Sequence, residues 1–304
     1  MKQPSDLYRP CTATIGFFDG VHRGHRYLIE QVMEAALQRR LDAAVITFPI
    51  HPRQVLQPTF RPELLTTYEE KLSLLTSLGI DRCITIDFTA STAALTARAF
   101  MQLLHDNYNV QALLIGYDHR FGHNRSEDFD DYVRYGKELD IEVVRAQAYT
   151  GGNAPTPVSS SAIRALLHKG DVSAAARCLD YNYLLEGTVV GGYHVGRTIG
   201  YPTANLRVNN PDKVIPADGV YAVHITVEGT TYQGMLYIGR RPTLHNGPER
   251  SIEVNIFGFH QDIYNCHIRI EFVSYVRGDQ TFSGMDELTA QLHKDEAEVR
   301  RLLN

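Results

Sequence analysis

Short apolar runs separated by amphipathic stretches fill the first half of the chain. We expect five of these runs to be strands: TATIGF (residues 12–17), AAVITF (43–48), CITIDF (83–88), ALLIG (112–116) and IEVVRA (141–146). Their nearly continuous apolar character is typical of parallel strands buried on both faces. A capping pattern, Thr66 or Thr67 followed three residues later by a glutamate, indicates a helix between two of them, which Gly79 ends. The alternation predicts an α/β domain with a doubly wound parallel sheet, whose ligands bind beyond the carboxyl ends of the strands.

The pattern changes after about residue 184. Before this point lies a loop rich in Gly, Pro, Ser and Thr (residues 149–160). Two short helices follow the loop, one capped by a serine and the other by Asp171. Strands then follow at LEGTVVGG (185–192), VYAVHITV (220–227), TYQGMLYIG (231–239), IEVNIFGF (252–259) and CHIRIEFVSYV (266–276). No long helix is expected before about Asp286. This part is predicted to be an antiparallel barrel or sandwich closed by a C-terminal helix, so the domains are residues 1–183 and 184–304.

Composition and charge narrow the class of protein. The 304 residues are 43% hydrophobic and 21% charged, as in a soluble globular protein, and the net charge of −5 gives no reason to expect a nucleic acid partner. The four scattered cysteines lack CxxC spacing, which favours a reducing cytoplasm over a disulfide framework. Neither a signal peptide nor a membrane span is expected. We expect a monomer or weak homo-oligomer.

Two histidines follow the first predicted strand. In GFFDGVHRGHRYLI (residues 16–29), His22 and His25 lie where a glycine-containing turn leads into a helix. They could be surface histidines, metal ligands or phosphate donors. A metal site would need a carboxylate or a third histidine in register, which this stretch lacks. The strand, the glycines and the helix start favour phosphate, because unpaired backbone N–H groups and the helix dipole attract anions there.

A second motif makes the phosphate interpretation more specific. HxGH resembles the signature of the nucleotidylyltransferase superfamily, in which two histidines stabilise the α-phosphate of ATP during in-line attack. In that superfamily an SSTxIR motif holds the β- and γ-phosphates. This chain has SSSAIR at residues 159–164, at a predicted helix N-terminus.

Further motifs identify one family. TFPIHPRQVL (residues 47–56) and LLIGYDHRFGHNRSED (113–128) resemble flavin-specific segments of the bacterial bifunctional riboflavin kinase/FMN adenylyltransferase family. GRTIGYPTANL (196–206), GVYAV (219–223), IGRRPTL (238–244), IEVNIFGF (252–259) and the C-terminal helix (286–303) are similar to its kinase domain. The resemblance covers nearly the whole chain. It implies a Rossmann-like nucleotidylyltransferase domain followed by a kinase barrel, which together convert riboflavin to FMN and then to FAD.

The resemblance also assigns roles in FMN adenylylation. His22, His25 and Arg164 are implied to be catalytic, with Arg164 a bidentate phosphate ligand. The implied ATP-binding residues of this domain are Gly16, Phe17, Asp19, Gly24, Ser160 and Ser161. The implied flavin-binding residues are His51, Pro52, Asp118 and Arg120. Because the FMN phosphate is already an anion, this step should need positioning and charge stabilisation more than a strong base.

In the kinase domain, the resemblance makes Glu253 the base that accepts the proton of the riboflavin 5′-hydroxyl. Periodicity alone leaves the face of Glu253 open, since it can be solvent or a ligand cavity. Thr203 and Asn205 are implied to hold Mg²⁺ with ATP, although a plain proline turn explains PTAN equally well without the resemblance. Thr203 and Gly196 are also implied to contact ATP, and Asp279 the flavin.

Departures from the family pattern are few. Relatives often have asparagine in place of Phe17, phenylalanine in place of His119, TFEPHP in place of TFPIHP and RDE in place of the RGD that ends at Asp279. A dinucleotide-dependent oxidoreductase would need GxGxxG after the first strand and an acidic residue after the second, and both are missing. A regulator with inactive sites is a further alternative, against which the intact catalytic residues argue.

Overall fold

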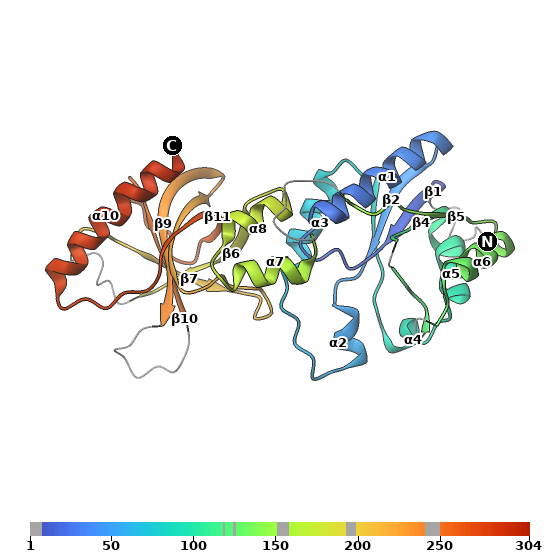
Figure 1. Cartoon of the computed structure of the whole chain (residues 1–304), viewed down its shortest axis with the longest axis horizontal. Helices are drawn as coiled ribbons and strands as arrows, with labels where there is room; N and C mark the ends of the chain where they lie inside the picture. Colours follow the sequence, from blue (N-terminus) through green and yellow to red (C-terminus); the bar gives the residue numbers. More distant parts are fainter. Residues whose placement is uncertain (1–7, 118, 124–125, 151–157, 193–198, 241–249) are drawn as a thin grey trace. The chain divides into compact units, whose positions relative to one another are not determined.

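The computed structural model describes residues 8–117, 119–123, 126–150, 158–192, 199–240 and 250–304 (Figure 1). The chain forms two compact units, Met1–Gly152 and Asn153–Asn304. Each unit has a hydrophobic core of its own. The division of activities at residues 183 and 184 stays a prediction.

A parallel sheet forms the centre of the first unit. Its strand order is β3-β2-β1-β4-β5, and all neighbouring strands run parallel. The bounds are β1 (Cys11–Ile15), β2 (Asp42–Thr47), β3 (Arg82–Thr85), β4 (Val110–Ile115) and β5 (Glu142–Arg145). All five strands predicted from the apolar runs are therefore confirmed.

Helices cover both faces of this sheet. They are α1 (Arg23–Arg39), α2 (Pro52–Leu56), α3 (Tyr68–Ser77), α4 (Ala90–Ala93), α5 (Ala97–Tyr108) and α6 (Phe129–Leu139). Ile15 packs in one cluster with Phe100 and Met101 of α5, whereas Val45 packs in another with Ile29 of α1 and Leu75 of α3. Burial on both faces explains why the strands lack a polar alternation.

The structure decides the start of α3, which the sequence left open. Thr67 is the N-cap: its side chain accepts from the Glu70 amide, and the Glu70 carboxylate accepts from the Thr67 amide at 2.8 Å. Thr66 instead donates its hydroxyl to Asp19 in the turn after β1. Thr67 therefore belongs to a capping box, whereas Thr66 makes a tertiary contact.

A closed antiparallel barrel forms most of the second unit, with strand order β10-β7-β6-β11-β8-β9. The strands are β6 (Tyr183–Val190), β7 (Ala204–Val208), β8 (Gly219–Val227), β9 (Thr230–Arg240), β10 (Arg250–Ile256) and β11 (His267–Arg277). Two helices precede them, α7 (Ser160–Leu167) and α8 (Val172–Leu179), whose N-caps are Ser159 and Asp171 as predicted. The strand that the sequence did not predict is β7, which begins in the PTAN motif (residues 202–205) and pairs with β6 and β10 in the barrel.

The predicted C-terminal helix, α10 (Met285–Leu303), packs against β8, β9 and β11 (Figure 1). Val299 of α10 is fully buried with Val220 and Met235 of the barrel. A nearly buried ion pair fastens the same helix, because the Arg277 guanidinium donates to the Asp295 carboxylate at 2.7–3.0 Å. Among the residues that the structure describes, no helix combines the length and apolar character needed to cross a membrane.

The Arg277–Asp295 pair gives a stability prediction. Asp295→Ala should lower the unfolding free energy of the second unit by about 3–5 kcal/mol, because it leaves the Arg277 charge buried without a partner. In calorimetry, this appears as a lower Tm of that unit. The matched control is Glu298→Gln, whose partner Arg301 lies at 2.6 Å but is largely exposed, and which should cost less than about 1 kcal/mol. Equal losses from the two substitutions would contradict the prediction.

Candidate active sites

The turn after β1 places the two histidines at the start of α1. His22 is the N-cap, and its Nδ1 accepts from the His25 amide at 3.3 Å. An accepting Nδ1 puts the proton of a neutral His22 ring on Nε2, which is then a donor. The two rings stack with centroids 3.6 Å apart and an interplanar angle of 15°. The predicted pair is therefore one preorganised unit at a helix N-terminus.

The environment of His25 keeps its ring neutral. Burial is the largest cause of a pKa well below its ordinary value of 6.5, followed by the charges of His22 and Lys71. Its Nδ1 is buried and has no hydrogen-bond partner among the described residues. A buried nitrogen without a partner is unusual in a folded protein and leaves this atom able to bond a ligand.

Asp19 lies between this turn and the next loop. Its carboxylate is 4% exposed and accepts from the amides of Leu65 and Thr66 at 2.9–3.1 Å. These bonds fix the turn that carries Gly20 and His22. The predicted contact of Asp19 with ATP thus stays a prediction, while its contact with the 65–66 loop is a feature that sequence reasoning missed.

Phe17 connects the turn after β1 with the predicted flavin segment. Its ring meets the His51 ring edge-on at 4.7 Å, and its carbonyl accepts from the Thr47 hydroxyl at 3.2 Å. His51 caps α2 through Nδ1, and Pro52 is the first residue of that helix. The structure thus brings together Phe17 and His51, which lie at the carboxyl ends of neighbouring strands.

The other predicted residues of adenylylation are more scattered. Arg120 is exposed after β4, and Asp118 lies outside the described residues. Ser160 begins α7 in the second unit, where Ser161 and Arg164 follow on the same helix. Gly16 and Gly24 lie before and within the start of α1, as expected.

Strand pairing builds the site in the barrel. Glu253 of β10 is directly opposite Asn205 of β7. The Thr203 hydroxyl donates to the Glu253 carboxylate at 3.2 Å, and the Asn255 amide donates to the Pro202 carbonyl at 2.7 Å. The structure thus brings together the predicted base and the predicted metal ligands, which are 48 or more positions apart in the sequence.

Glu253 faces a pocket rather than open solvent. A pocket of about 310 Å³ is lined by Glu253 and Asn255, by Tyr237 of β9 and by Leu288 and Leu292 of α10. The alternate residues Ile252 and Val254 are buried instead. Periodicity alone left open whether Glu253 faces solvent or a cavity. Because α10 covers this face of the barrel, Glu253 faces a cavity.

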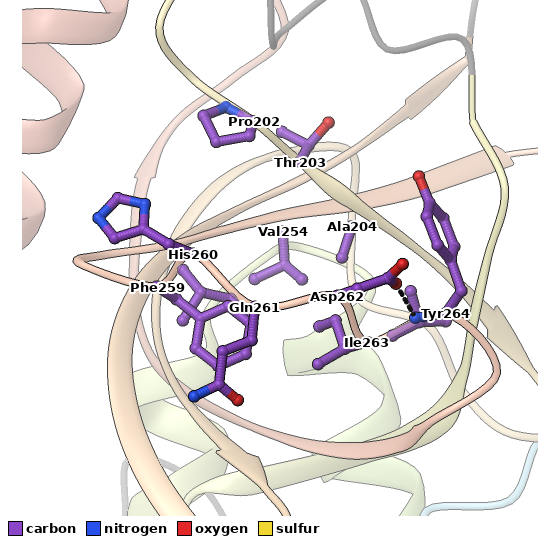
Figure 2. Close-up of a pocket in the computed structure, with 12 residues that line it drawn as sticks. Pro202, Thr203, Ala204, Val254, Phe259, His260, Gln261, Asp262, Ile263 and Tyr264 are labelled. Carbon is purple, nitrogen blue, oxygen red and sulfur yellow. Dashed lines mark hydrogen bonds between the residues drawn. The ribbon is translucent and has the colours of Figure 1, made fainter.

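A second pocket, of about 600 Å³, lies on the other face of β10. Val254 and Ile256 line it, whereas the first pocket contains the alternating Glu253 and Asn255. Figure 2 shows residues 259–264 along one side of it, with Pro202 and Thr203 on another. Thr203 lines both pockets, so they meet at the residue that holds Glu253.

Asp279, the predicted flavin contact, lines the Glu253 pocket. It is exposed and accepts from the Tyr237 hydroxyl at 3.0 Å. Burial is the largest cause of a raised Tyr237 pKa, and the bond to Asp279 is the next. Tyr237 therefore stays a neutral donor at any physiological pH.

The predicted metal ligands are Thr203 and Asn205. Within the described ranges, no group of three or more His, Cys, Asp and Glu side chains could hold a metal ion. Thr203 and Asn205 offer a hydroxyl and an amide oxygen, which suit a hard cation that also binds ATP phosphates. Gly192 makes room for Asn205, because a Cβ on Gly192 would overlap the Asn205 side chain. Gly196, the predicted ATP contact, lies outside the described residues.

Comparison with known proteins identifies the family of each half of the chain. The family described as FAD synthetase matches residues 5–162, and the family described as riboflavin kinase matches residues 179–303. The bifunctional riboflavin kinase/FMN adenylyltransferase of Listeria monocytogenes is 37% identical over 292 residues, which are 94% of this chain and 90% of that protein. The Escherichia coli K12 protein of the same name is 36% identical, with 95% and 92% covered.

The chain belongs to the bifunctional riboflavin kinase/FMN adenylyltransferase family. This enzyme carries an N-terminal FAD synthetase domain and a C-terminal riboflavin kinase domain. A crystal structure named macrolide-efflux protein, from Streptococcus pneumoniae, has a TM-score of 0.87 and 31% identity, covering 99% of this chain and 97% of that one. Its name describes the Streptococcus protein alone.

Sequence reasoning missed several residues around these sites. The missed residues are Lys71 beside Phe17, Tyr237 beside Asp279, and the pocket wall at residues 259–264. A lysine at a buried helix position is a signal that could have pointed to Lys71, because lysines are almost never fully buried. The wall at 259–264 carries no comparable signal, since its place depends on the barrel's closure.

Gly192 gives a prediction about the kinase site. Gly192→Ala should lower the rate of FMN formation at least about tenfold, because the added methyl group displaces the Asn205 side chain. Gly191→Ala is the matched control, since its Cβ meets nothing within 4 Å, and it should stay within about twofold. Riboflavin phosphorylation by both variants, measured by chromatography, checks this. Equal rates for the two variants would contradict a role for the close approach.

Proposed function

We propose that the barrel phosphorylates riboflavin with Glu253 as the base. The observation that carries this proposal is that two pockets, on opposite faces of β10, meet at Thr203 beside Glu253. The pocket under α10 would hold riboflavin, with Asp279 and Tyr237 at one side, and the pocket walled by residues 259–264 would hold the adenosine of ATP. The reacting 5′-hydroxyl and γ-phosphate would then meet near Thr203.

Glu253 would accept the proton of the riboflavin 5′-hydroxyl while the hydroxyl oxygen attacks the γ-phosphorus of ATP and ADP leaves. The Thr203 hydroxyl, which donates to Glu253, would fix the carboxylate for this transfer. The Asn255 amide holds the carbonyl of Pro202 and so supports the turn on which Thr203 lies. These contacts position the base before substrate arrives.

Thr203 and Asn205 would hold Mg²⁺ together with the phosphates of ATP. The fit rests on their oxygen donors and on the space that Gly192 leaves beside Asn205. A bound Mg²⁺ would neutralise the charge that develops on the transferred phosphate. Thr203 would therefore both hold Mg²⁺ and orient the Glu253 carboxylate.

A metal titration tests this assignment. Asn205→Ala should raise the Mg²⁺ concentration needed for half-maximal FMN formation by about tenfold or more. The Mg²⁺ requirement of FAD formation from added FMN should not change. Asn209→Ala, at an exposed position in the following turn, is the control and should leave both requirements unchanged. An unchanged requirement in Asn205→Ala would remove Asn205 from the metal site.

For adenylylation, we propose that His22 and His25 donate to the α-phosphate of ATP while a phosphate oxygen of FMN attacks it and pyrophosphate leaves. The neutral ring of His25 and its buried Nδ1 without a partner among the described residues support this role. By resemblance of SSSAIR, we assign Ser160, Ser161 and Arg164 to the β- and γ-phosphates. The turn after β1 would contact ATP through Gly16, Phe17, Asp19 and Gly24. The flavin would be contacted by His51, Pro52 and Arg120.

Product analysis separates the two reactions. With riboflavin, ATP and Mg²⁺, His25→Ala should stop at FMN. Glu253→Ala should make no FMN, a loss of about 10²-fold or more, yet still adenylylate added FMN. The circular dichroism spectrum and Tm of each variant check that the substituted unit is folded. If either folded variant lost both reactions, the division of labour between the sites would be wrong.

We also propose that the enzyme works in the cytoplasm on small molecules, as a monomer or weak homo-oligomer. The cysteines Cys11, Cys83, Cys178 and Cys266 are all free thiols, which suits a reducing compartment. Size-exclusion chromatography at micromolar concentration tests the oligomeric state, and a stable larger assembly would contradict the proposal.

A further inference from the structure

A buried lysine lies beside the adenylylation site without a role in the chemistry above. Lys71 is on α3 and is 1% exposed. Burial of an ammonium group is unfavourable unless specific contacts compensate for the lost water. Those contacts show what Lys71 is used for.

Lys71 connects the ends of β1 and β2. Its Nζ donates to the Phe48 carbonyl at 2.8 Å and lies 3.9 Å from the centroid of the Phe17 ring. Phe48 directly follows β2 and precedes the His51 segment, while Phe17 follows β1. One ammonium group therefore holds the segments that follow β1 and β2 at the carboxyl end of the sheet.

Phe17 is in contact with both Lys71 and His51. The His51 ring meets it edge-on at 4.7 Å, and the Lys71 ammonium makes a cation–π contact with it. The Phe17 ring thus contacts a side chain of α3 and the N-cap residue of α2.

Charged and titratable groups surround Lys71 on several elements. Burial lowers its pKa to about 8, an effect that Asp19 and Cys83 partly oppose. Lys71 in turn helps to lower the pKa of His25. The ring of Tyr68, on the same helix, lies 5.8 Å from Nζ.

We propose that Lys71 is a positioning residue for FMN adenylylation. By holding the Phe17 ring and the Phe48 carbonyl, it fixes the turn after β1, which carries His22, relative to the segment after β2, which carries His51. The proposal rests on the assignment of this reaction to the site of His22 and His25. It does not require contact between Lys71 and substrate. It requires the charge, because a neutral side chain can keep the bond to Phe48 but not the cation–π contact.

The first test is Lys71→Gln, whose amide can still donate to the Phe48 carbonyl. Its kcat/KM for FMN adenylylation should fall about tenfold, with a raised KM for FMN, while riboflavin phosphorylation by the same chain is unchanged. Lys137→Gln, at an exposed position on α6, is the matched control and should keep both rates. Adenylylation by Lys71→Gln within twofold of the wild type would overturn the proposal.

A double-mutant cycle tests whether Lys71 acts through Phe17. Phe17→Leu keeps an apolar side chain without the aromatic face. If the cation–π contact matters, the loss of activity in the double variant Phe17→Leu/Lys71→Gln should be smaller than the product of the two single losses. Losses that multiply as independent effects would overturn the proposal.

The unsubstituted enzyme provides a measurement that does not depend on folding of a variant. Adenylylation should decline as pH rises through about 8, because Lys71 then loses its proton. Burial raises the pKa of Cys83 and lowers that of His25, so neither changes charge near pH 8. Lys71→Gln should lack this decline, and a decline of the same size in Lys71→Gln and in the wild type would overturn the proposal. Active His25→Ala would instead overturn the catalytic assignment, which keeps the two failures distinct.

Discussion

Antiparallel pairing of β7 with β10 is the constraint on which the kinase site depends. It places Glu253 opposite Asn205 and closes the barrel. Since successive residues of a strand point to opposite faces, the same pairing directs Glu253 toward the pocket under α10 and Val254 toward the other pocket. A shift of this pairing by one residue would exchange the two faces of β10. The pocket that each of Glu253 and Val254 faces therefore depends on the register of this one strand pair.

The first unit uses a different constraint, the common edge at which parallel strands end. The turn after β1 and the segment after β2 leave this edge side by side and carry His22 and His51. Asp19 ties the turn to residues 65 and 66, and Lys71 ties it to Phe48 through the Phe17 ring. Buried charges thus organise a loop region that apolar packing alone would leave loose.

The two sites also differ in the chemistry that their surroundings support. A riboflavin hydroxyl is a neutral nucleophile, and the barrel presents a carboxylate fixed by Thr203. The phosphate of FMN is already an anion, and the first unit presents stacked histidines, of which His25 is held neutral by burial. A neutral ring can donate a hydrogen bond to phosphate without the cost of burying another charge.

The sequence by itself determined the strands of the sheet, the caps at Ser159 and Asp171, and the resemblance that places His22, His25, Glu253 and Asn205 in one enzyme family. These features depend on local periodicity or on short motifs. Tertiary structure alone decided that Thr67 rather than Thr66 caps α3, that β7 closes the barrel, that Glu253 faces a pocket, and that Lys71 lies against Phe17. Each depends on segments distant in the chain, whose contacts no local pattern records.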